Sequence, residues 1–196
     1  MEFLVVGVVL VVIVVSVFIY LTHSGMFTSV SISTGRPPIG RVVLAYKFTT
    51  GSYTHCGNFF GEFAQLDGKR VSIGLYYDNP DEVPAEKLRW AVGQIVAENG
   101  EKLDGAVKKQ YEEAGCKFIT LPPIRAAITA KFHYKNNISM YFGMRSFYSK
   151  LMAYIAEKNL RKDLCMEIYD GNTVRFMVPL DQQESFVVPE AREKRN

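Results

Sequence analysis

The sequence has 196 residues, of which 48% are apolar, and its 23 basic and 20 acidic residues give a net charge of +3. This composition excludes a long disordered chain and a collagen-like polymer. The charge is too mild for a dedicated duplex-binding domain, so it predicts no direct nucleic-acid partner. Glu2 is the only charged residue before Arg36, and the regions on either side of Arg36 therefore need separate interpretations.

The N-terminal region is an apolar stretch, from Phe3 to Leu21, without a charged residue. As a helix rising about 1.5 Å per residue it would reach about 28 Å, close to the hydrocarbon thickness of a bilayer. We expect an uncleaved transmembrane anchor over residues 1–23. One alternative is a cleaved secretory signal, which would need a positive start, a shorter core and small residues at a cleavage site. The other is a buried helix of a soluble protein, for which the many valines are unusual.

The flanking charges predict the orientation of this span. Basic residues tend to stay in the cytosol, and Arg36, Arg41 and Lys47 follow the span while no Lys or Arg precedes it. The N-terminus should therefore be lumenal and the rest of the chain cytosolic. The three widely spaced cysteines suit neither a disulfide framework nor a zinc site, which agrees with this orientation. Asn137 begins a glycosylation sequon that only a lumenal domain could use, so the topology is testable.

Residues 24–40 mix Ser, Thr, Gly and Pro, and we expect a juxtamembrane linker with one short strand through Val30 and Ile32. The domain should follow over residues 41–189, with a charged tail over residues 190–196. In the first half of the domain we expect strands over residues 42–48, 71–78, 88–96 and 116–122, and helices through Phe59, Phe63 and Leu66 and through Val107, Tyr111 and Ala114.

The second half begins the same order again. We expect a strand over residues 124–132, a helix capped by Asn136 or Asn137, and a hairpin of strands over 164–170 and 173–180. The string LYYD, which ends at Asp78, matches EIYD, which ends at Asp170.

These matches predict an internal duplication, although chance similarity between two amphipathic hairpins is the alternative. Trp90 and Phe176 lie in the strands that follow the matched strings. We therefore expect an α+β fold of two pseudo-symmetric strand-helix-strand-strand repeats with an antiparallel sheet. A cleft should form between the halves, because concave sites favour such seams.

Two blocks carry a resemblance to a known module, YYDNPDEVPAEKLRWAVG (76–93) and CMEIYD followed by VRFMVPL (165–180). They resemble the gyrase-inhibitor-like domain, a small-molecule-binding module that is also attached to bacterial multidrug-sensing regulators. The anchor, GRPPIG followed by VVLAYKF, and FMVPL followed by FVVPE extend the likeness to about Glu190. As a whole, the chain resembles the testis-expressed protein 264 family.

The resemblance implies a single-pass endoplasmic reticulum (ER) receptor for selective autophagy of the ER. It implies partners among the lipidated ubiquitin-like autophagy modifiers, and links to the hexameric AAA segregase and to repair of topoisomerase adducts. In the family an aromatic-x-x-aliphatic motif in a long acidic tail binds the modifier, but this sequence ends at Asn196 without that tail. The string from Tyr148 to Leu151 is a weak candidate, and we interpret it as core because the modifier binds an extended peptide.

The resemblance also implies a ligand cleft. Bacterial relatives hold cationic aromatic compounds against a buried carboxylate and aromatic rings, which offset the desolvation of the cation. Glu167 is the candidate acid, and Tyr77, Trp90 and Tyr169 are the candidate rings. In the alternative interpretation Glu167 faces outward and pairs with Arg175, and the rings are ordinary core and rim residues.

We therefore predict a non-enzymatic receptor or adaptor at the ER membrane. One alternative is a membrane-tethered small-molecule sensor. Another is a hydrolase of electrophilic metabolites that uses Glu167 and Tyr169, which share one face of a strand, as acid-base groups. The sequence has no phosphate-binding glycine loop and no zinc-ligand spacing, so we expect no cofactor and no metal.

Overall fold

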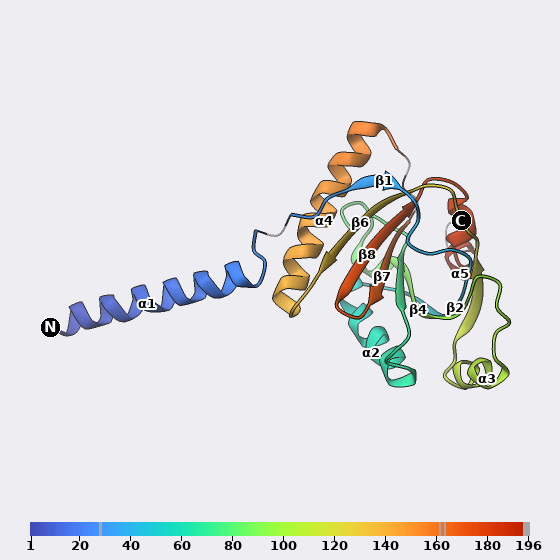
Figure 1. Ribbon diagram of the computed structural model, residues 1–196, viewed down its shortest axis with the longest axis horizontal. Helices are drawn as coiled ribbons and strands as arrows, with labels where there is room; N and C mark the ends of the chain where they lie inside the picture. The colour runs from blue at the N-terminus through green and yellow to red at the C-terminus, as the bar shows by residue number, and fades with distance from the viewer. Residues whose placement is uncertain (28, 161, 163, 194–196) are drawn as a thin grey trace.

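The N-terminal helix stands apart from the remainder of the molecule. The computed structural model describes residues 1–27, 29–160, 162 and 164–193. Its helix α1 (Glu2–His23) projects outward and has no buried residue (Figure 1). By length and composition α1 could cross a membrane, and its position near the N-terminus suits either an anchor or a signal sequence. The predicted apolar helix is therefore confirmed.

In the part of the chain that the structure describes, eight strands form one antiparallel sheet in the order β1-β6-β8-β7-β3-β4-β2-β5. The strands are β1 (Ser33–Gly35), β2 (Val42–Thr50), β3 (Ser72–Tyr76), β4 (Arg89–Glu98), β5 (Lys117–Leu121), β6 (Ala127–His133), β7 (Cys165–Asp170) and β8 (Thr173–Pro179). The helices are α2 (Cys56–Leu66), α3 (Gly105–Glu113), α4 (Asn137–Lys158) and α5 (Pro189–Glu193), with single 3-10 turns at Tyr53–His55, Ala85–Lys87 and Gln183–Phe186. The predicted α+β fold is confirmed, although β6 begins three residues later than expected.

The strand order is the same on both sides of the pair β3 and β7. Moving outward, β3 is followed by β4 and β2, and β7 is followed by β8 and β6. Each half also places a helix after its first strand, since α2 follows β2 and α4 follows β6. The predicted strand-helix-strand-strand duplication is confirmed, and its two copies meet where β3 pairs with β7.

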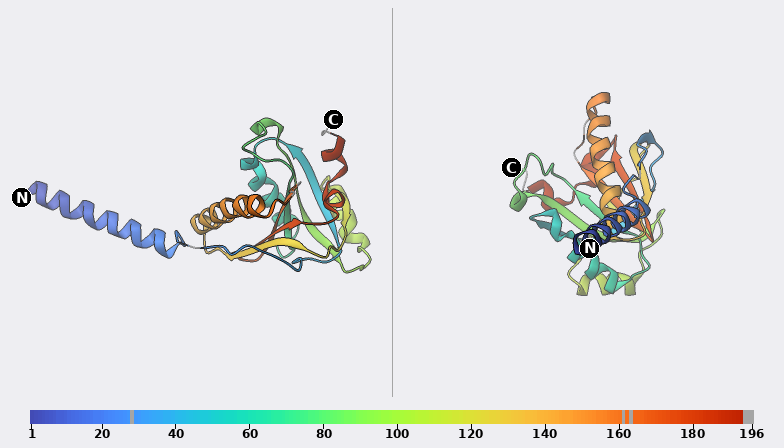
Figure 2. Two further views of the ribbon diagram at one scale, coloured as in Figure 1. Left: turned by 90° about the horizontal axis from the view of Figure 1, so that it is seen from above. Right: turned by 90° about the vertical axis from the view of Figure 1, so that its left-hand side faces the viewer.

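One face of the sheet is covered by α2 and α4, which Figure 2 shows on the side opposite α5. The packing on this face is largely aromatic. Phe63 of α2 is fully buried in a cluster with Trp90 and Tyr111. Phe147 of α4 stacks on Phe176 in a second cluster, which belongs to the other half of the domain.

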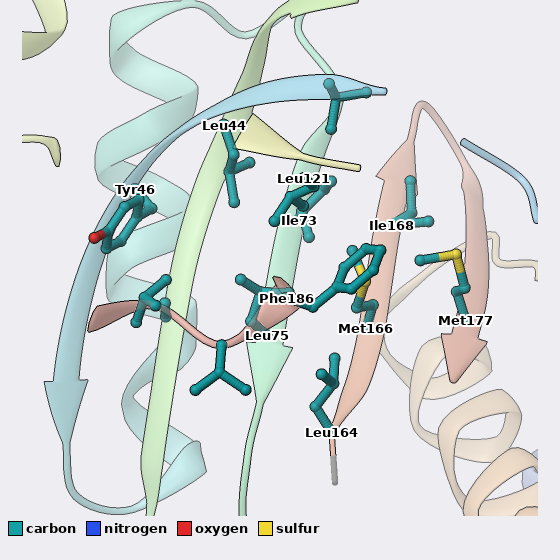
Figure 3. Packing of buried hydrophobic residues seen from close by; sticks show 14 of the residues in the cluster. Leu44, Tyr46, Ile73, Leu75, Leu121, Leu164, Met166, Ile168, Met177 and Phe186 are labelled. Carbon is teal, nitrogen blue, oxygen red and sulfur yellow. The ribbon is translucent and has the colours of Figure 1, made fainter. Parts of the chain in front are cut away.

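The C-terminal segment covers the other face. Phe186, Val188 and Ala191 of this segment are buried in one cluster with Leu75 and Met166 of the central strands. Figure 3 shows Phe186 lying over these two strands. Because both faces of the sheet are covered, successive residues of the central strands β3 and β7 are buried on both sides.

We expected a charged tail over residues 190–196, but residues 190–193 belong to helix α5 (Pro189–Glu193), which packs against the domain. Glu190 accepts hydrogen bonds from Lys117 Nζ at 2.6 Å and from Tyr46 Oη at 3.0 Å. Because these partners are distant in sequence, the run of charged residues after Pro189 did not by itself indicate a helix. Residues 194–196 lie outside the described residues.

The segment expected as a free linker over residues 24–40 is partly built into the domain. Ser24 and Val30 are buried, and Lys150 Nζ of α4 donates a hydrogen bond to the Val30 carbonyl at 2.9 Å. The short strand expected through Val30 and Ile32 forms instead as β1 at Ser33–Gly35, where it pairs with β6. The folded domain therefore starts within a few residues of α1.

Candidate functional site

A cavity of about 310 Å³ lies over the junction of the two halves, between α2 and α4. Its size suits a small organic molecule. Most of its wall is apolar or aromatic, and its polar groups come from β3, β7 and α4, from the loop after β3, and from Tyr53, Cys56 and Lys162. The lining residues are Tyr53, Cys56, Tyr76, Asp78, Asn79, Pro80, Asp81, Met144, Tyr148, Met152, Lys162, Cys165, Glu167 and Tyr169.

Glu167 provides the central polar group of this cavity. It lies on β7 and is only 2% exposed. Tyr148 of α4 donates a hydrogen bond to its Oε1 at 2.6 Å, and Tyr169 donates one to its Oε2 at 2.7 Å. Each carboxyl oxygen thus has a phenol donor, which satisfies the requirement that a buried polar group be hydrogen-bonded.

Gly74 of β3 makes room for this arrangement. It lies directly opposite Glu167 in the antiparallel register. A Cβ atom at position 74 would come within 2.8–3.0 Å of ring atoms and the hydroxyl of Tyr76. The Tyr76 ring therefore occupies the space above Gly74 and lines the cavity together with Glu167.

Burial in the cavity disfavours the charged forms of its acid and of its phenols. Burial raises the pKa of Glu167, and this effect outweighs the lowering caused by Tyr148, Tyr169 and Tyr76. Burial and the nearby carboxylate raise the pKa of Tyr76 and of Tyr148 well above the ordinary range. At neutral pH these phenols therefore remain hydrogen-bond donors.

The two thiols in the cavity are weak nucleophiles. Burial raises the pKa of Cys165 to about 12, and burial also raises the pKa of Cys56. Since the thiolate is the reactive form, neither cysteine is set up for covalent catalysis. Among the described residues, no group of three or more His, Cys, Asp or Glu side chains could hold a metal ion.

The structure brings together two of the four candidate ligand residues. Glu167 and Tyr169 line the cavity, as their shared strand face predicted. Tyr77 does not, because it lies on the opposite face of the sheet and its hydroxyl donates to the Phe186 carbonyl at 3.4 Å. Trp90 does not either, since its Nε1 donates to the Gly51 carbonyl at 2.9 Å and its ring packs in the core.

The error at Tyr77 comes from the match of LYYD with EIYD. That match equates Tyr77 with Tyr169, but the two residues lie on opposite faces of the sheet. A displacement of one residue along a strand moves every side chain to the other face. The tyrosine of β3 that enters the cavity is Tyr76, which the alternation through Gly74 would have indicated.

The alternative pairing of Glu167 with Arg175 is wrong, because Arg175 Nη2 instead bonds Asp170 at 2.9 Å. Tyr148 was considered only as part of a weak autophagy-modifier motif, and its role beside Glu167 was missed. In the structure Tyr148 donates to Glu167 and Leu151 is fully buried, both within α4. That string is therefore core, as the sequence analysis favoured.

Comparison with known proteins gives a clear relationship. No family model matches the chain. The testis-expressed protein 264 homolog of Mus musculus is 39% identical over 171 residues, and testis-expressed protein 264 of Homo sapiens is 37% identical over 171 residues. Over these residues the chain is similar in sequence to testis-expressed protein 264. Both alignments cover 87% of this chain and 55% of the relative, so the chain spans about half the length of these curated relatives.

The chain is also similar to a gyrase inhibitor in sequence and to a solved structure in fold. A DNA gyrase inhibitor of Salmonella arizonae is 58% identical over 38 residues, which cover 17% of this chain and 24% of that protein. The EcmrR chain in a cryo-electron microscopy structure of its DNA complex has a TM-score of 0.52 and 15% identity, covering 85% of this chain and 64% of its own. The predicted gyrase-inhibitor-like fold is confirmed.

The buried acid should make stability depend on pH in a particular direction. Because the folded-state pKa of Glu167 is raised, its contribution to stability is present below the ordinary pKa of 4.5 and is lost as the pH rises through the folded-state pKa. Glu167→Gln removes this loss. The variant should therefore gain stability relative to the unchanged chain as the pH rises above 4.5. The total gain in the free energy of unfolding should be about 1.4 kcal/mol for each pH unit by which the folded-state pKa of Glu167 exceeds 4.5.

Denaturant unfolding of the full chain in detergent micelles, repeated between pH 4 and pH 8, measures this difference. Glu113→Gln is the matched control, because the Glu113 side chain is 69% exposed on α3 and should give a constant difference. A constant difference for Glu167→Gln over the same range would contradict the assignment.

Proposed function

We propose that this chain is a single-pass ER membrane protein whose cytosolic domain serves as a receptor or adaptor in selective autophagy of the ER. The observation that carries the proposal is α1, an exposed apolar helix joined to a folded domain through a connector of a few residues. This arrangement holds the domain at a membrane surface. The similarity to testis-expressed protein 264 over 87% of the chain supports the same role.

In this proposal the contact with the autophagy modifier comes from outside the folded domain. The three aromatic-x-x-Leu strings that follow α1 lie in regular elements, namely α2, β5 and α4. In each string at least one of the two defining residues is fully buried, namely Phe63, Leu121 and Leu151. The modifier binds an extended peptide that adds a strand to its sheet. In this proposal that peptide belongs to a partner, such as the AAA segregase, or to a longer form of the chain.

The topology can be tested through Asn137, which is exposed at the start of α4. With the domain in the cytosol, the chain expressed in cells should keep its mass after glycosidase treatment, and Asn137→Gln should leave that mass unchanged. A variant with an Asn-Gly-Thr sequon placed before Met1 should gain a glycan, because its N-terminus would be lumenal. A glycan on Asn137 would contradict the proposed topology and every cytosolic role.

The same cells test the receptor role. The tagged chain should coincide with an ER marker, and removal of residues 2–23 should disperse it. Expression of the anchored chain should raise starvation-induced cleavage of an ER turnover reporter at least about twofold over the variant without residues 2–23. No difference between the two chains would contradict the proposal.

A second candidate function, the binding of a lipophilic cation, is favoured by the cavity. Glu167 offers a buried carboxylate at the base of the cavity, surrounded by the aromatic rings of Tyr76, Tyr148 and Tyr169. A cation would replace the proton on this acid, and ring faces would add cation-π attraction. Of the other acids that line the cavity, Asp78 is already paired with Arg89 at 2.6 Å and Asp81 is exposed, so Glu167 is the buried acid.

A fluorescent aromatic cation titrated into the full chain in detergent tests this second function. Glu167→Gln should weaken binding at least about tenfold, since a charge-assisted contact is lost. Below the folded-state pKa of Glu167, binding to the unchanged chain should weaken about tenfold per pH unit, because the proton competes with the dye. Glu113→Gln should bind the dye unchanged, and equal affinity for Glu167→Gln would exclude Glu167 as the anionic site.

A further inference from the structure

A second hollow, larger and more open than the cavity at Glu167, lies between the segment after α1 and one side of α4. Its volume is about 880 Å³. Six of its lining residues carry the inference: Met26, Phe27, Tyr141, Phe142, Arg145 and Lys150. We name this surface the juxtamembrane groove.

The groove lies next to the end of α1. Met26 and Phe27 follow His23, the last residue of α1, by three and four residues. Even a fully extended chain spans at most about 14 Å over four residues. Figures 1 and 2 show α4 on the side of the domain from which α1 departs. If α1 spans a bilayer, the groove therefore lies at the bilayer surface, whichever way the protein is oriented.

The exposed apolar residues of the domain gather on this side. After α1, the large apolar side chains that are exposed in the described part of the chain are Phe27, Tyr141 and Met152. Phe27 is 73% exposed and Tyr141 is 61% exposed, and both line the groove. Met152 follows Tyr141 on α4 by eleven residues, about three helical turns, so the two share a face. Aromatic rings of this kind are enriched where protein meets the headgroup region of a membrane.

The charge of the groove is positive. Its charged lining residues are Arg145 and Lys150, and no Asp or Glu lines it. Lys150 Nζ donates to Ser29 Oγ at 2.5 Å and to the Val30 carbonyl at 2.9 Å, so it fixes the connector against α4. Arg145 lies one turn after Tyr141 and is exposed, and the described residues give its guanidinium no hydrogen bond or ion pair.

We propose that the juxtamembrane groove is a second membrane contact, in which Phe27 and Tyr141 enter the headgroup region and Arg145 and Lys150 hold the phosphate of an anionic phospholipid. The proposal rests on the proposed anchor α1. Positive charge near a membrane surface is complementary to anionic lipid, and aromatic side chains with mixed polarity suit the interface. The occupant of the groove is therefore a lipid surface.

This contact has a consequence for the cavity at Glu167. Met144 and Tyr148 line both the groove and the cavity. Docking of α4 on the bilayer would place the entrance of the cavity at the lipid interface. Lipophilic cations accumulate there, so the membrane itself would deliver such ligands to Glu167.

Fluorescence quenching in vesicles tests the membrane contact with the full chain. Tyr141→Trp places a reporter in the groove, while the natural Trp90 is 1% exposed and gives the same background in every variant. In vesicles of phosphatidylcholine and phosphatidylserine with brominated acyl chains, the reporter at position 141 should lose about half of its emission. Lys109→Trp on α3, whose side chain is 77% exposed, is the matched control and should lose none.

Arg145 tests the lipid class. Adding Arg145→Glu to Tyr141→Trp should reduce the quenching to the level of the control, and Arg145→Lys should restore it. Both effects should vanish in vesicles of phosphatidylcholine alone, because the positive charge then has no anionic partner. Unchanged thermal unfolding of the variants in detergent shows that each one is folded.

Three results would overturn the proposal. The first is a chain that stays with the vesicles after an alkaline wash while its reporter at position 141 is not quenched. This result would show that α1 is inserted but that the groove does not touch lipid. The second is emission from the reporter at position 141 that changes with protein concentration but not with lipid. This result would show that a second copy of the chain occupies the groove. Loss of the chain from the vesicles in the alkaline wash would refute the anchor as well.

Discussion

The antiparallel pairing of β3 with β7 joins the two halves of the domain, and its register sets Gly74 opposite Glu167. This single pairing determines the site. The missing side chain at position 74 leaves space for the Tyr76 ring, and the helices that follow β2 and β6 supply the walls. Glu167 is thereby held out of water, which raises its pKa more than the hydrogen bonds from the phenols lower it, and it is the buried acid of the cavity.

The two faces of the sheet are covered in different ways. The C-terminal segment covers one face with Phe186, Val188 and Ala191, which are buried in the core there. The other face is covered by two separate helices, and the cavity lies between them. Of these, α4 also borders the segment that follows α1. If α1 holds the protein at a membrane, α4 is the helix nearest the bilayer, and α4 also forms one wall of the cavity. The proposed anchor and the proposed ligand site are therefore connected through α4.

Much of the fold could be predicted from the sequence because it depends on local patterns. The apolar span, the alternation of strands, the Asn136 cap of α4 and the duplicated order of elements all left signals in the chain. Glu167 and Tyr169 were named through the resemblance to the gyrase-inhibitor-like domain, and their spacing of two residues on one strand correctly placed them on the same face. The failures depend on tertiary contacts. Tyr76 was missed in favour of Tyr77 by one residue of register, and α5 forms through contacts of Glu190 with residues far away in sequence.

The most direct test of this account is the titration of the Glu167 carboxyl itself. Carbon NMR of the full chain, labelled at the glutamate carboxyl groups and assigned with Glu167→Gln, follows the ionisation of this one group with pH. We predict a midpoint above the ordinary value of 4.5, and a further rise in Tyr148→Phe, because the tyrosine hydrogen bond lowers the pKa. A midpoint at or below 4.5, or no response to Tyr148→Phe, would contradict a desolvated carboxyl held by phenols at the junction of the two halves.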